Sequence, residues 1–314
     1  MDNLTHSLVG ALIGQAGLKR RTGLAMPALI IGANLPDIDA SCVLLGDMQH
    51  LALRRGLTHG PIAWVMLPLV LASALWWFDR WQERRGKRPK GRAPVHFGWL
   101  YALSLIACLT HPALDWLNSY GIRLLEPFSH RWFYGDVLFI IDVWLWLGLG
   151  FATWLSLRRE KRGGEWRRPA RVAIAGALAY IGVNAGITAV AERRSQMGEP
   201  YLPGQVAIAN PPPLAFWRRD IVVGQPADWW ARNPDTGAIG PITNQPCGWP
   251  DVDSLRRTRP DLDAFLFWSR ASFAERAPDG SILIRDARYY SPLSSGRFTV
   301  ALPEARCVQP PAAG

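Results

Sequence analysis

Six apolar segments in the first 190 residues most constrain how this chain can fold. They cover roughly residues 4–18, 23–35, 61–78, 97–118, 137–157 and 172–190. A membrane-spanning helix needs about 20 apolar residues, and the last four segments approach that length. The first two are shorter, which is typical of tilted, re-entrant or buried helices. The sequence therefore predicts a mainly α, polytopic membrane bundle of about six apolar helices.

The rest of the chain has a different composition. Residues 191–314 contain many Pro, Asp and Arg, and strand-like stretches alternate there with turn residues. These stretches are 205–209, 216–223, 264–270, 281–290 and 297–302. Such a shift in composition marks a domain boundary. We expect a membrane-embedded helical domain at residues 1–190, followed by a smaller β-rich soluble domain at residues 191–314.

Basic residues are concentrated between the apolar segments. Of 35 Lys and Arg, three lie in Lys19–Arg21, seven in Arg80–Arg92 and seven in Arg158–Arg171. The positive-inside rule predicts that these loops face the cytoplasm. A net charge of +10 would also suit a nucleic-acid partner. The placement of the charge between apolar segments argues for membrane lipids instead, and no nucleic acid is expected.

The alternation of helices across the membrane predicts where both ends of the chain lie. With the basic loops inside, the N-terminus and residues 191–314 lie outside, which in a bacterial inner membrane means the periplasm. The positive charges follow the first apolar run, whereas a cleavable signal has the reverse order. Cys247 and Cys307 could pair in an oxidising compartment, and the sequence alone leaves this pairing open.

Ionisable residues recur at one predicted face of this bundle. The tripeptide Leu-Thr-His ends at His6, His59 and His111, which are three of the six histidines. His111 and Asp115 share a helix face, and the predicted topology brings both to the outer side of the membrane with the other two histidines. Ionisable groups in membrane segments are costly, so they indicate function. The predicted metal ligands are His6, Asp37, His59, His111 and Asp115.

This mixed nitrogen and oxygen set predicts the cofactor and the chemistry. It suits a divalent metal, above all zinc but also manganese or iron, with one or two ions bound. Two ions bridged by a carboxylate are typical of phosphoester hydrolysis by a metal-activated water. Asp37 or Asp39 is the predicted general base. Either aspartate could instead cap a helix, and Asp37 is the preferred ligand.

Several weaker candidates surround this set. Asp136 could complete a second metal site or cap the fifth helix, and His130 is a further candidate ligand. Asn118 could orient a substrate or cap a helix end. Asp142 is expected inside the fifth helix, where an unpaired carboxylate is costly. The Thr before each of the three repeated histidines could cap a helix, orient a ligand or simply belong to a helix start.

Four motifs together carry a resemblance to a known family. "LTHSLVGALIG", "GANLPDIDA", "RRGLTHG" and "HPALDWLNSYG" resemble the YdjM-like family of bacterial inner-membrane metal-dependent hydrolases, also called domain of unknown function 457. The resemblance covers roughly residues 1–190. That family is similar to the superfamily of zinc-dependent phospholipase C and single-strand nuclease, whose helical core holds three zinc ions.

The resemblance implies the same five ligands, with Asp115 bridging two metals. The superfamily's N-terminal Trp ligand is absent, and its later ligands have no clear match beyond His130, Asp136 or Asp142. One or two ions are therefore expected rather than three. We expect a membrane-bound hydrolase whose phosphoester substrate is a lipid or an envelope precursor.

A non-enzymatic role is the alternative. The family name is associated with binding of the SOS repressor LexA, which implies a regulatory or partner-docking membrane protein with a structural metal. A metal transporter would need ligands along a path near the membrane midplane, whereas these ligands are predicted at one end.

Overall fold

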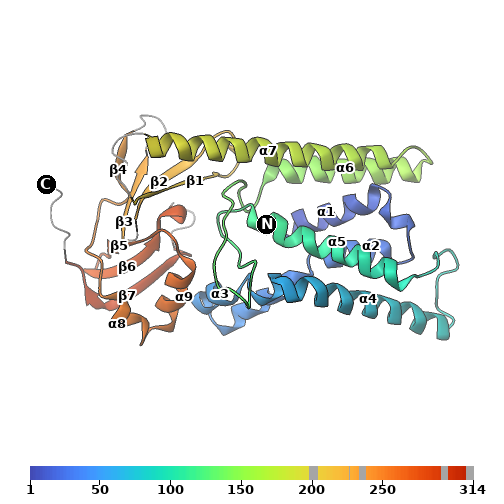
Figure 1. Ribbon diagram of the computed structural model, residues 1–314, viewed down its shortest axis with the longest axis horizontal. Coiled ribbons are helices and arrows are strands. Elements are labelled where there is room, and N and C mark those ends of the chain that lie inside the picture. The colour runs from blue at the N-terminus through green and yellow to red at the C-terminus, as the bar shows by residue number, and fades with distance from the viewer. Residues whose placement is uncertain (198–203, 226, 233–237, 291–295, 309–314) are drawn as a thin grey trace. The chain divides into compact units, whose positions relative to one another are not determined.

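The computed structural model describes residues 1–197, 204–225, 227–232, 238–290 and 296–308 (Figure 1). The chain divides into two compact units. The helical unit comprises residues 1–39, 55–185 and 213–215, and the sheet unit comprises residues 40–54, 186–212 and 216–314. The predicted boundary between residues 190 and 191 falls inside helix α7 (Arg167–Met197), which runs through it without a break. The exact position of the boundary therefore stays a prediction.

The helical unit is built from long helices around two short ones. Its helices are α1 (Asn3–Gln15), α2 (Ala25–Gly32), α4 (Pro61–Arg84), α5 (Phe97–Trp116), α6 (Val143–Lys161) and the first part of α7, with the short 3₁₀ helices η1 (Leu18–Arg20), η3 (Leu57–His59) and the start of η2 (Leu35–Leu45) between them. Helix α5 packs against α4 and α2, and α1 packs against α2 and α6. The first part of the chain is thus mostly helical, as predicted.

The prediction of six membrane-spanning helices is not supported. Among the described residues, α4, α5 and α7 are long and apolar enough to cross a membrane, and α2 with residues 35–44 makes a fourth candidate if that pair, bent by 44°, counts as one span. Helix α1 has 13 residues, so it is about 20 Å long, against a hydrocarbon core of about 30 Å. Helix α6 begins at Val143 rather than near residue 137, and its last turn is charged.

The short helices α1 and α2 cross each other at close backbone contact. A Cβ atom at Gly10 of α1 would lie 2.5 Å from the carbonyl oxygen of Leu29 in α2, so only glycine allows this crossing. Small residues of α2 make a similar contact with α5, because Ala28 is fully buried and a Cβ atom at Gly32 would lie 3.0 Å from the Ala107 Cβ. Small residues at helix interfaces let backbones approach closely in membrane proteins. This packing brings the first turn of α1 and the end of α2 to the end of α5.

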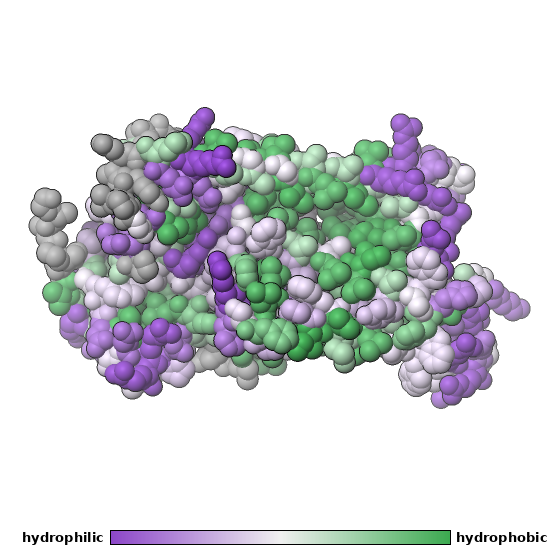
Figure 2. All heavy atoms as spheres, in the orientation of Figure 1, coloured by the Kyte–Doolittle hydropathy of each residue, from purple (hydrophilic) through white to green (hydrophobic). Residues whose placement is uncertain are grey.

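The three basic loops meet at one end of the helical unit. Lys19 pairs with Glu160, the Arg171 guanidinium donates to the Ala16 carbonyl at 3.1 Å, and Gly23 N–H donates to the Pro94 carbonyl at 2.9 Å. Figure 2 shows hydrophobic side chains covering the long helices and hydrophilic ones gathered at this end. The three basic loops, which are far apart in the sequence, therefore lie together at the same end of the helical unit.

The sheet unit contains two antiparallel sheets and short helices. The first sheet has the order β1-β2-β3-β4 and the second β5-β6-β7. The strands are β1 (Val206–Asn210), β2 (Asp220–Gln225), β3 (Asp228–Arg232), β4 (Ile239–Pro241), β5 (Ser272–Arg276), β6 (Ser281–Asp286) and β7 (Thr299–Arg306). The helices are α3 (Asp47–Leu53), α8 (Val252–Arg256) and α9 (Pro260–Trp268), with the 3₁₀ helix η4 at Ala287–Tyr289. The prediction that the C-terminal part of the chain contains β-sheet is confirmed.

One predicted strand is wrong. Residues 264–268 belong to helix α9, in which Pro260 occupies the first turn with Asp261 and Asp263. A proline and acidic side chains at this position favour a helix N-terminus, because the first N–H groups have no partner within the helix. Cys247 and Cys307, the pairing that the sequence left open, form a disulfide with a Cα–Cα distance of 5.5 Å.

Candidate metal centre

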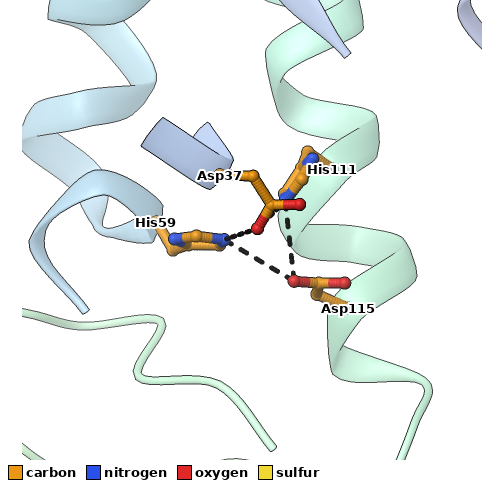
Figure 3. A group of neighbouring side chains, drawn as sticks. All are labelled: Asp37, His59, His111 and Asp115. Carbon is orange, nitrogen blue, oxygen red and sulfur yellow. Dashed lines mark ion pairs between the residues drawn. The ribbon is translucent and has the colours of Figure 1, made fainter. Parts of the chain in front are cut away.

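Four buried side chains from three elements meet at one end of the helical unit. Asp37 lies in the first turn of η2, directly after α2, and His59 ends η3 just before α4. His111 and Asp115 lie one turn apart near the end of α5. Their side chains point toward a common centre (Figure 3). One ligand atom from each of the four lies within 4.8 Å of all the others, so this group could hold a metal ion.

The distances between these atoms fit ligands of one metal better than hydrogen bonds. Asp115 Oδ2 lies 3.5 Å from Nε2 of both His59 and His111. Asp37 Oδ1 lies 3.6 Å from His111 Nε2 and 4.0 Å from His59 Nε2. Bonds of about 2.0–2.2 Å in a tetrahedral zinc site place neighbouring ligand atoms about 3.3–3.6 Å apart. Most hydrogen bonds in proteins are shorter than this.

Both histidines of the group are held with Nε2 facing the centre. His111 Nδ1 lies 2.7 Å from the Ala33 carbonyl oxygen, which can only accept, so the neutral ring carries its proton on Nδ1. His59 Nδ1 lies 2.9 Å from the Thr58 hydroxyl and 3.3 Å from Asp39 Oδ2. A second hydrogen bond of this kind fixes the ring and tautomer of a metal-ligating histidine.

Asp39 lies beside this group rather than in it. Its Oδ2 accepts hydrogen bonds of 2.8 Å from the Arg55 N–H and from the Thr58 hydroxyl. Burial lowers the pKa of His59 to about 4, although the hydrogen bond and the charge of Asp39 act in the opposite direction. His59 is therefore neutral near pH 7, as a metal ligand must be. Among the threonines of the three Leu-Thr-His tripeptides, Thr58 makes the kind of contact expected of a ligand-orienting residue, because its hydroxyl lies 2.9 Å from His59 Nδ1.

His6 adjoins the four groups from a different side. Its ring stacks on that of His111 with centroids 3.8 Å apart, and its Nε2 lies 3.3 Å from Asp115 Oδ1. The Met1 amino group contacts the same oxygen. Asp115 thus faces His59 and His111 with Oδ2, and His6 with Oδ1.

The three weaker candidates lie outside the four-residue group. Asn118 is buried, and its Oδ1 accepts from Arg55 Nη1 at 3.0 Å and from the Tyr120 N–H at 2.9 Å. The His130 side chain is 68% exposed and contacts Glu126. Asp136 is buried with a left-handed backbone (φ 53°). None of the three belongs to the four-residue group found among the described residues, and their predicted roles stay predictions.

Two assignments on the fifth predicted helix need correction. The N-cap of α6 is Asp142 rather than Asp136, because Asp142 Oδ1 accepts from the Leu145 N–H at 2.9 Å. Asp142 is therefore not an internal helical residue, and its other oxygen accepts from the Tyr180 hydroxyl at 2.9 Å. An aspartate directly before an apolar helical run is a signal for a helix start.

Sequence reasoning missed Arg55. Its guanidinium is buried, with Nε 2.9 Å from Asp115 Oδ2 and Nη2 3.1 Å from Asp115 Oδ1. The available signal was an arginine two residues before the Leu-Thr-His that starts at Leu57, in a chain expected to bury aspartates, since a buried carboxylate requires a partner.

The comparisons with known proteins agree with this architecture. The chain matches the YdjM inner membrane protein family over residues 1–190. It belongs to this family. The match covers nearly all of the helical unit and contains all four clustered residues. The group that could hold a metal ion therefore lies in the part of the chain that matches the family.

One curated relative adds little about activity. The chain is 28% identical over 140 residues to "Uncharacterized protein YfhP" of Bacillus subtilis (strain 168). This alignment covers 42% of the chain and 39% of that relative, so the chain matches about two fifths of the relative's length. No solved structure matches the chain.

Proposed function

We propose that this YdjM-family protein is a metal-dependent hydrolase of the inner membrane that acts on a phosphoester in a lipid or envelope substrate. The observation that carries the proposal is the buried group of two imidazole nitrogens and two carboxylate oxygens within 4.8 Å of one another. Polar and ionisable groups in a membrane protein's apolar part are retained for function. We propose zinc as the ion, since it prefers this donor set in a tetrahedral arrangement.

Each residue has a defined task in this proposal. Asp37, His59, His111 and Asp115 would hold the ion, and Asp39 and Thr58 would orient His59. When bound, a divalent ion polarises an ester oxygen and activates water for attack. The general-base role of Asp37 or Asp39 stays a prediction. The similarity to zinc-dependent phospholipases C also stays a prediction.

The number of ligands favours a second candidate function. Catalytic zinc sites keep a position open beside three protein ligands, whereas four protein ligands are typical of structural zinc. All four side chains of this group are buried. A regulatory or partner-docking membrane protein with a structural ion, for instance of the LexA-binding kind, would have such a site without catalysis.

A hydrolysis assay separates these two functions. Detergent-purified protein is stripped with a chelator, reloaded with zinc, manganese or iron, and incubated with bis(p-nitrophenyl) phosphate and with a fluorogenic phospholipid. Hydrolysis that returns with the ion in wild type and in His130→Ala, but not in His111→Ala, would support the enzyme. A tightly bound ion with no hydrolysis of either compound would overturn it in favour of the structural metal.

We further propose that the N-terminus and the sheet unit lie in the periplasm. Two observations support this orientation: the basic loops lie at the ends of α4 and α5 that are away from His59 and Asp115, and Cys247 and Cys307 form a disulfide. Disulfides persist in oxidising compartments, and basic loops stay in the cytoplasm.

The disulfide offers a direct test of this orientation. In cells treated with an alkylating agent before lysis, we expect peptides containing Cys247 and Cys307 to remain linked in mass spectra taken without reduction. Cys42 and Cys108 form no disulfide among the described residues and serve as internal controls, since both should be alkylated once the protein unfolds. Alkylation of all four cysteines without a reducing agent would contradict a periplasmic sheet unit.

A further inference from the structure

Arg55 is a buried cation in contact with a predicted metal ligand. Its residue is 1% exposed. The guanidinium forms a two-point contact with Asp115, from Nε to Oδ2 at 2.9 Å and from Nη2 to Oδ1 at 3.1 Å. Arginine is suited to this paired geometry because its donors form a rigid fork, and its charge is permanent.

The remaining contacts of Arg55 fix this guanidinium in place. Nη1 donates to Asn118 Oδ1 at 3.0 Å and to the Gly121 carbonyl at 3.2 Å, and the group lies 4.7 Å from the centre of the Tyr120 ring. The backbone of Arg55 is held as well, because its N–H donates to Asp39 and its carbonyl accepts from the Arg123 N–H at 2.9 Å. Because these donors already contact protein groups, we expect Arg55 to hold a fixed positive charge beside Asp115 and not to bind a substrate.

The position of this charge limits what Asp115 can bind. Oδ2 also faces His59 and His111, each 3.5 Å away, so it can still contribute one bond to an ion between them. A bridging role would require Oδ1 to bind a second ion on the side of His6. Arg55 Nη2 and the Met1 amino group both contact that oxygen, whereas Oδ2 is contacted only by Arg55 Nε among these two cations. Two donors engage both lone pairs of Oδ1, and one lone pair of Oδ2 is left for an ion. A second divalent ion would lie beside a permanent positive charge in a buried site, where like charges repel strongly.

We propose that Arg55 takes the place of a second metal ion, so that the centre holds a single ion and Asp115 does not bridge two. This inference rests on the proposed metal function. It assigns Arg55 a positioning role, in which it neutralises Asp115, orients it and blocks its second oxygen. His6 is then a neighbour of the centre that ligates no ion while Arg55 is present.

Metal counting with Mn²⁺ tests the inference. Purified wild-type protein, Arg55→Met and the double variant His6→Ala/Arg55→Met are stripped, saturated with Mn²⁺, and analysed for bound manganese and by electron paramagnetic resonance. We expect one isolated ion per chain in wild type. Arg55→Met has a similar length without the charge, so it should approach two ions with a spin-coupled spectrum. Loss of His6 should return the count to one.

Different results would overturn different claims. Two ions or a spin-coupled spectrum in wild type would refute the inference. This measurement on wild type is decisive even if Arg55→Met does not fold. A folded Arg55→Met protein, judged by size-exclusion chromatography, that still binds one ion would refute it too. A wild-type protein that binds no ion would instead refute the metal function on which the inference rests.

Discussion

Replacement of His111 by alanine is expected to remove the metal from the protein. Wild type purified in detergent should carry about one divalent ion per chain, and His111→Ala almost none. The reason is that His111 Nε2 lies 3.6 Å from Asp37 Oδ1 and 3.5 Å from Asp115 Oδ2, between the two carboxylates. Loss of a residue that only orients a ligand costs about 10–100-fold in affinity, and loss of a ligand should cost more. Elemental analysis measures this directly.

Two further variants make the measurement specific. His130→Ala removes an exposed histidine that contacts Glu126 outside the cluster, so it should keep the ion. Asp39→Asn should weaken binding by about 10–100-fold without abolishing it, because Asp39 contacts His59 rather than the centre. Equal metal content in wild type, His111→Ala and His130→Ala would argue that this group binds no ion.

Replacement of Asp115 by leucine is expected to destabilise the protein even when no metal is present. The Arg55 guanidinium, which is fully surrounded by protein, would lose its carboxylate partner. Removal of one partner from a buried ion pair costs about 3–5 kcal/mol, because the remaining charge is left without compensation. Denaturant unfolding in detergent with a chelator present measures the free energy of unfolding without a contribution from the ion.

Matched variants separate this cause from a general loss of packing. Glu83→Leu breaks the exposed pair with Arg80 and should change the free energy of unfolding by about 1 kcal/mol or less. The double variant Asp115→Leu/Arg55→Met removes the carboxylate and the guanidinium. The buried Met1 amino group still loses its partner, so the double variant should recover only part of the lost stability. A double variant as unstable as Asp115→Leu alone would show that the buried charge is not the cause.

Side-chain chemistry was easier to predict than the number of membrane spans. Asp37, His59, His111 and Asp115 stood out because ionisable residues near apolar segments are rare, and the structure brings these four together. The count of spans depended on where helices begin and end. Apolar residues 137–141 were expected to start a helix, but α6 begins only after Asp142, which caps it. Hydrophobicity indicates burial, and backbone conformation is decided by local capping as well.

The sequence by itself determined the apolar and basic pattern of residues 1–190, the change to a β region, and the residues able to bind a metal. Only the tertiary structure decided which oxygen of Asp115 faces which partner, that Asp39 orients His59, and that Arg55 contacts Asp115. These contacts join residues far apart in the chain, and Arg55 pairs with a carboxylate 60 positions away. No periodicity or spacing encodes such a contact, because it arises only when the turn before η3, the end of α5 and the loop after α5 are packed together.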